Sequence, residues 1–214
     1  MQYTKVPAID SELPEAPEDP CDPCGLQATL SRLGLAANGG CDPEWAAIVQ
    51  GTWWYAASCF AYCAAGGLLL LHPEPVERHM SAFPWRLMGL SVFANGFFSY
   101  MGDVETWGRS SAWKSADRVL ATTNTVLQIV IVGLACAGVP ERPFPLEAVA
   151  ALATGVVGAL ACKQRAASAL QRVDVHAYMR YHSGWHYVMC LGAIVAQLLL
   201  HRRCDYAAAG CACG

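Results

Sequence analysis

The longest stretch of this sequence without a charged side chain runs from Trp45 to Leu71. It exceeds the about 20 apolar residues that a helix needs to cross the hydrocarbon core of a bilayer. The composition of the whole chain fits the same solvent, because 14% of its residues are charged, whereas soluble proteins carry about 25%. These few ionisable side chains do not suffice to cover a water-facing surface. The sequence therefore predicts an integral membrane protein.

Four further apolar runs follow the first, over residues 83–101, 119–139, 146–162 and 181–200. Together the runs predict an all-α fold, a polytopic transmembrane helical bundle with five spans. The segment 163–180 carries Arg165, Arg172 and Arg180, so we expect it to lie along the membrane interface. The count becomes six or seven if residues 146–180 fold back.

The composition divides the chain into three parts. Residues 1–43 are acidic and rich in proline and predict a disordered tail, residues 44–203 form the transmembrane domain, and residues 204–214 form a short tail rich in Cys and Ala. The first part lacks the basic start and apolar stretch of a cleavable signal, so we expect the run at Trp45 to be retained as a span. Cys21 and Cys24 are a weak indication of a zinc site. A solvated tail or a site of lipid attachment is the favoured interpretation of this pair.

Charge bears on partners and orientation. The net charge of −3 provides no basic field for a nucleic-acid backbone, so membrane lipids are the expected partners. Basic residues gather in the loop that carries Arg109, Lys114 and Arg118 and in the segment 163–180, which places both on the side of a cytoplasmic amino terminus. We expect a multi-pass protein of an endomembrane or the plasma membrane.

Ionisable residues at membrane depth are costly, so they are functional candidates. Ser99 and Asp103 end the second run and are four residues apart, which stacks them on one helical face. Asp117 opens the third run, and His182 and His186 open the last. In a five-span topology these three ends lie at the same membrane face, so the five side chains can meet.

Two imidazoles and a carboxylate are regular ligands of zinc. A zinc ion acidifies a bound water toward neutral pH and makes it a nucleophile. A carboxylate that does not bind the metal, such as Asp117, can take the proton of that water, and Ser99 can hydrogen-bond the water or the substrate carbonyl. The predicted site therefore has Asp103, His182 and His186 as metal ligands and Ser99 and Asp117 as catalytic groups.

The three motifs Asn-Gly-Phe-Phe-Ser99-Tyr-Met-Gly-Asp103, Asp117-Arg-Val-Leu-Ala and His182-Ser-Gly-Trp-His186 resemble, in order and approximate spacing, those of the CREST superfamily of membrane hydrolases. That superfamily includes the alkaline ceramidases, the progestin and adipoQ receptors and the hemolysin III-like proteins. The resemblance extends over about residues 45–201 and implies a zinc-dependent hydrolase of a lipid amide or ester, with its cavity open to the cytoplasmic face.

Two features depart from the family pattern. Asp103 stands where the family has a histidine, and the family usually has seven spans. The first departure gives a site of two His and one Asp, but it also fits a receptor-like or scaffolding protein that keeps the fold without catalysis. The missing helix pair would narrow a lipid-binding cavity.

Each candidate also has a purely structural interpretation. His182 and His186 can be interfacial histidines, Asp103 and Asp117 can cap helix ends in a wet loop, and Ser99 can be a packing residue. A third function is electron transfer by a haem held between His72 and His201, which fall at the opposite membrane face.

Overall fold

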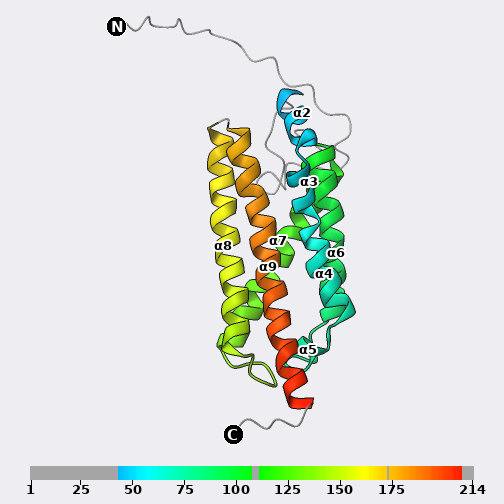
Figure 1. The fold of residues 1–214 in the computed structure, drawn as a ribbon, viewed down its shortest axis with the longest axis vertical. Coiled ribbons are helices and arrows are strands. Elements are labelled where there is room, and N and C mark those ends of the chain that lie inside the picture. The colour runs from blue at the N-terminus through cyan, green and yellow to red at the C-terminus, as the bar shows by residue number, and fades with distance from the viewer. Residues whose placement is uncertain (1–42, 108–110, 173, 209–214) are drawn as a thin grey trace, which may run out of the picture.

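The computed structural model describes residues 43–107, 111–172 and 174–208. In these residues every regular element is a helix and no strand occurs. Five rods run alternately up and down (Figure 1); they are α3 with α4 (Trp53–Cys59 and Ala61–Leu71), α6 (Trp85–Tyr100), α7 (Ala112–Cys136), α8 (Leu146–Gln171) and α9 (Val175–Ala208). The prediction of an all-α helical bundle is confirmed.

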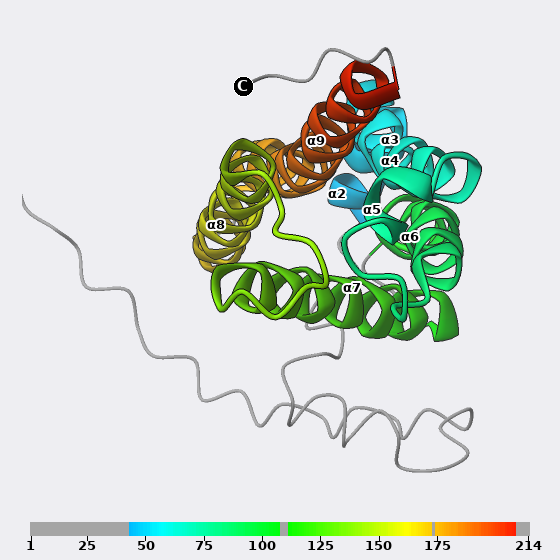
Figure 2. The same ribbon diagram turned by 90° about the horizontal axis from the view of Figure 1, so that it is seen from below.

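The rods form a closed ring when the bundle is viewed along its length (Figure 2). The order around the ring is α4, α6, α7, α8 and α9, and each rod contacts the next, with α9 contacting α4 to close it. Short elements lie at the two ends. At one end α2 (Pro43–Gly51) contacts η1 (Met101–Glu105), a π-helical turn that continues α6, and at the other α5 (Glu74–Glu77) contacts α9.

Four helical stretches in the described part of the chain are long and apolar enough to cross a membrane: Trp53–Leu71, Ala112–Cys136, Leu146–Gln171 and Val175–Arg202. Large apolar side chains are exposed on them, as lipid-facing surfaces require, among them Leu71, Val126, Val157 and Leu191. This arrangement fits a multi-pass membrane protein. The remaining predicted span, over residues 83–101, corresponds to α6. This helix has 16 residues, about 24 Å at 1.5 Å per residue, and it passes directly into η1.

The first apolar run is not one helix. Thr52 adopts an extended backbone conformation, and its hydroxyl donates to the carbonyl of Ile48 at 2.6 Å, so α2 ends there. A second interruption at Phe60 separates α3 from α4. The membrane-crossing part therefore begins at Trp53 rather than at the predicted Trp45.

Two further boundaries differ from the prediction. The segment 163–180 is not a separate interfacial helix, because α8 continues to Gln171 and the carboxylate of Asp174 accepts a hydrogen bond from the backbone N–H of Ala177 at 2.9 Å, which caps the start of α9. The third span begins at Ala112 rather than near Asp117, since the Ser111 hydroxyl caps α7 by accepting from the Lys114 N–H at 3.2 Å. The predicted carboxyl-terminal tail overlaps α9, whose backbone is helical to Ala208.

Candidate metal centre

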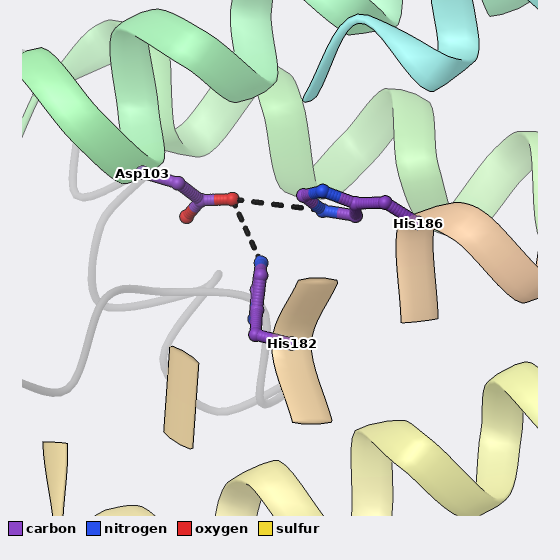
Figure 3. A group of neighbouring side chains, drawn as sticks. All are labelled: Asp103, His182 and His186. Atoms are coloured by element: carbon purple, nitrogen blue, oxygen red, sulfur yellow. Dashed lines mark hydrogen bonds and ion pairs between the residues drawn. The ribbon is translucent and has the colours of Figure 1, made fainter. Parts of the chain in front are cut away.

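Three side chains from two separate segments converge at one end of the bundle. Asp103 comes from η1, and His182 and His186 come from α9 (Figure 3). The Asp103 Oδ2 atom lies 2.9 Å from Nε2 of His182 and 3.9 Å from Nε2 of His186. One potential ligand atom from each residue lies within 4.8 Å of the others. This is a group of donors that one metal ion could bridge.

The π-helical turn places Asp103. Its wider hydrogen bond joins the N–H of Thr106 to the carbonyl of Met101 at 3.0 Å, and such turns occur frequently at functional sites. Gly102 lets this turn approach α7 closely, because a Cβ atom there would lie 3.0 Å from the Cα atom of Lys114. The Ser99 hydroxyl, one turn earlier, donates to Oδ2 of Asp103 at 3.2 Å and fixes the carboxylate.

A serine on α3 fixes His186. The Ser58 hydroxyl donates its hydrogen to the carbonyl of Tyr55 at 2.7 Å and lies 3.0 Å from Nδ1 of His186. Because a hydroxyl has one hydrogen, the Ser58 oxygen can accept from Nδ1–H, and in that tautomer Nε2 keeps its lone pair. That Nε2 atom faces Asp103 and Ser99, with the Ser99 Oγ atom at 3.5 Å. In that tautomer His186 presents an unprotonated nitrogen to the cluster.

Aromatic rings hold His182. Its imidazole centroid lies 5.9 Å from the ring of Tyr55 and 5.1 Å from that of Tyr178. The side chain of His182 is 22% exposed, whereas those of Asp103 and His186 are 4% and 2% exposed. The open side of the cluster is therefore at His182.

The charge environment keeps the carboxylate ionised. Burial acts to raise the pKa of Asp103, which lies beyond the end of α6, but the neighbouring His182, Lys114 and His186 outweigh burial and hold the pKa below its ordinary value. A carboxylate must be deprotonated to bind a metal ion, so this environment suits a ligand.

A cavity adjoins the cluster on the side of α7 and α8. It holds about 980 Å³ of empty space, part of it open to the outside, and Asp103, Asp117, His182 and His186 all contribute to its wall. Two cationic residues, Arg118 and Lys163, line the same space. A polar group of a ligand could thus contact the candidate metal ligands, the Asp117 carboxylate and two cations at once.

The structure brings together the five residues that the sequence predicts for the site. Asp103, His182 and His186 form the cluster, and Asp117 is buried and lines the adjoining cavity. Ser99 is fully buried, does not line that cavity and hydrogen-bonds to Asp103 instead.

Sequence reasoning missed the residues that support the cluster, namely Ser58, Tyr55 and Tyr178. All three lie in or beside apolar runs, where nothing in the pattern distinguishes them from packing residues. The sequence also predicts Lys114 as part of a basic loop, whereas its side chain is buried at the start of α7.

The opposite end of the bundle holds the pair considered for haem. The rings of His72 and His201 lie 6.2 Å apart between centroids, and both line a separate cavity with Gln197. Electron transfer at this pair stays a prediction, which visible absorbance of the purified protein would test. The pair Cys21 and Cys24 lies outside the described residues.

Comparison with known proteins gives no relative that bears on this site: no family model matches the chain, and neither a curated protein nor a solved structure is significantly similar to it.

Proposed function

We propose that this chain is a zinc-dependent hydrolase of a lipid amide or ester. The observation that carries the proposal is the convergence of Asp103, His182 and His186, with one ligand atom of each within 4.8 Å of the others. The resemblance of the three motifs to the CREST hydrolases points to the same chemistry.

The donor set fits zinc. Asp103, His182 and His186 would hold the ion through two imidazoles and one carboxylate, and three protein ligands with room for a water or substrate are the pattern of catalytic zinc sites. The hydrogen bond from His186 to Ser58 supports the fit, because zinc-binding histidines usually donate their other ring N–H to a nearby acceptor. When bound, the ion would supply a water of lowered pKa and polarise the substrate carbonyl.

Asp117 is the group best placed to move the proton. It lines the cavity beside the cluster without belonging to the group of candidate ligands, so in this proposal its carboxylate takes a proton from the attacking water. The water oxygen then bonds to the carbonyl carbon, the C–N or C–O bond breaks, and Asp117 returns the proton to the departing amine or alcohol. Ser99 positions Asp103 through its hydrogen bond.

A lipid substrate follows from where the cavity lies. The space is enclosed by helices of a membrane bundle, and Tyr62 lines both this cavity and an apolar cavity deeper in the ring. A ligand that enters there can place a polar linkage at the cluster and an alkyl chain among apolar side chains.

Metal content by mass spectrometry on detergent-purified protein tests the proposal. Wild type should hold about one zinc per chain, the double variant His182→Ala/His186→Ala should lose it, and His176→Ala, an exposed histidine on the same helix, should keep it. The zinc-loaded protein should also hydrolyse a lipid amide or ester. A well-folded wild type without metal after zinc loading refutes the hydrolase.

A non-catalytic, receptor-like or scaffolding role is the alternative, and one observation favours it. The Asp103 carboxylate and the His182 imidazole are 2.9 Å apart and can hydrogen-bond directly, so the cluster can be satisfied without an ion. A folded protein that neither binds zinc nor hydrolyses lipid amides or esters would support this role.

A further inference from the structure

An apolar cavity lies deeper in the ring than the candidate metal centre. It holds about 850 Å³ of empty space, part of it open to the outside, and large apolar side chains such as Trp85, Met88 and Ile131 form most of its wall. Tyr62 contributes to the wall of this cavity and of the one at the candidate metal centre, so the two cavities are neighbours.

Two buried amides interrupt this apolar wall on α7. Asn124 is 1% exposed and Gln128 is 5% exposed, and both line the cavity. The Ser91 hydroxyl donates to Oδ1 of Asn124 at 2.9 Å, which fixes the orientation of that amide. Neither Nδ2 of Asn124 nor Oε1 of Gln128 has a hydrogen-bond partner among the described residues.

A third amide comes from α9. Gln197 lines this cavity as well as the separate one at His72 and His201, and its buried Nε2 atom likewise has no partner among the described residues. Leaving a buried polar group without a hydrogen bond is unfavourable, so three such atoms around one cavity indicate a polar group in its occupant. A hydroxyl suits them, because its oxygen accepts from the amide N–H groups while its hydrogen is donated to Oε1 of Gln128.

The amides lie at a defined depth below the metal centre. Gln128 follows Asp117 by eleven residues on α7, and Gln197 follows His186 by the same number on α9. At 1.5 Å per residue both glutamines lie about 16 Å along the helix axis from the centre, a distance that an extended chain of roughly a dozen carbons covers, and Asn124 lies about one helical turn nearer to the centre than Gln128. Near the centre, Arg118 and Lys163 are suited to an anionic headgroup.

We propose that the two neighbouring cavities together bind a long-chain amphiphile, with its anionic headgroup at Arg118 and Lys163 in one cavity and a hydroxyl, about a dozen carbons along the chain, at Asn124, Gln128 and Gln197 in the other. The proposal concerns binding alone, so it holds whether or not the neighbouring cluster carries out hydrolysis.

Native mass spectrometry of the detergent-purified protein, titrated with 12-hydroxyoctadecanoate or octadecanoate, tests this site. The hydroxylated chain should bind about fivefold more tightly, as one additional net hydrogen bond implies. The isomer 2-hydroxyoctadecanoate places its hydroxyl at the wrong depth and should bind like octadecanoate. Equal affinities for all three chains would overturn the proposal and leave bound water as the partner of the amides.

Variants of the buried amides test whether they recognise the hydroxyl. Gln128→Leu should abolish the preference for the hydroxylated chain and keep the affinity for octadecanoate, which also shows that the cavity is intact. Gln164→Leu removes an exposed glutamine of α8 and should retain the preference. A preference that survives Gln128→Leu and Asn124→Leu alike would overturn the proposal. Wild type stripped of metal by a chelator should still prefer the hydroxylated chain, so failure of the zinc proposal would be recognised separately.

Discussion

Ser58 and His186 are 128 positions apart in the chain, yet the hydroxyl of one lies 3.0 Å from Nδ1 of the other in the buried interior of the bundle. The hydroxyl hydrogen is already committed to the carbonyl of Tyr55. The Ser58 oxygen can therefore accept from Nδ1–H, and in that tautomer Nε2, the nitrogen that faces Asp103, keeps its lone pair.

Removing that acceptor should weaken metal binding without removing a ligand. We predict that Ser58→Ala lowers zinc affinity about 10- to 100-fold, the usual effect of losing a partner that orients a metal-binding histidine. Competition with a zinc chelator measures the change. Ser168→Ala is the matched control, because the exposed Ser168 hydroxyl donates to the Gln164 carbonyl as Ser58 does to Tyr55 but lies away from the cluster. Unchanged affinity in Ser58→Ala would contradict the assigned tautomer.

Asp103 should be replaceable only by another ligand. We predict that Asp103→Ala loses zinc, because two imidazoles alone leave the ion with half of its usual four ligands. Asp103→His should keep about one zinc per chain, since it restores a donor at the same position. Metal analysis distinguishes the two variants, and Glu105→Ala, which removes an exposed carboxylate from the same turn, should have no effect. Full zinc content in Asp103→Ala would exclude this residue as a ligand.

Asp117 should matter for turnover and not for metal. We predict that Asp117→Asn retains zinc and slows hydrolysis of a fluorogenic long-chain amide by about 100- to 10,000-fold, the range for losing a positioned general base. The control Asp174→Asn keeps a good cap at the start of α9, so its activity should stay near that of wild type. If Asp117→Asn loses its metal as well, Asp117 is a ligand and the assigned roles must change.

The candidate site could be predicted from the sequence because polar side chains are rare in membrane-spanning helices. An imidazole or carboxylate among apolar helices is conspicuous, and four-residue spacing places Ser99 with Asp103 and His182 with His186 on common faces. The alternating direction of the spans then brings these faces to one end of the bundle, where the structure has them.

What the sequence did not predict depends on local backbone chemistry and packing. The end of α2 at Thr52 and the cap at Asp174 each depend on one side chain that hydrogen-bonds to nearby backbone. In the sequence these single residues are hidden within a long apolar run and a basic segment, so they are not recognised as helix boundaries. The π-helical turn at Asp103 and the contact of Ser58 with His186 arise only when separate helices pack.

The bundle itself should be most sensitive where α8 and α9 pack closely. A Cβ atom on Gly192 would lie 2.7 Å from the Cα atom of Gly155, so a side chain there must push the two helices apart. We predict that Gly192→Val lowers the stability by about 1–3 kcal/mol, as overpacking usually does, with a matching fall in Tm in detergent. Gly133→Ala is the control, because nothing lies within 4 Å of a Cβ atom at Gly133 and alanine favours the helix. An unchanged Tm in Gly192→Val would show that α8 and α9 are not packed as closely as described.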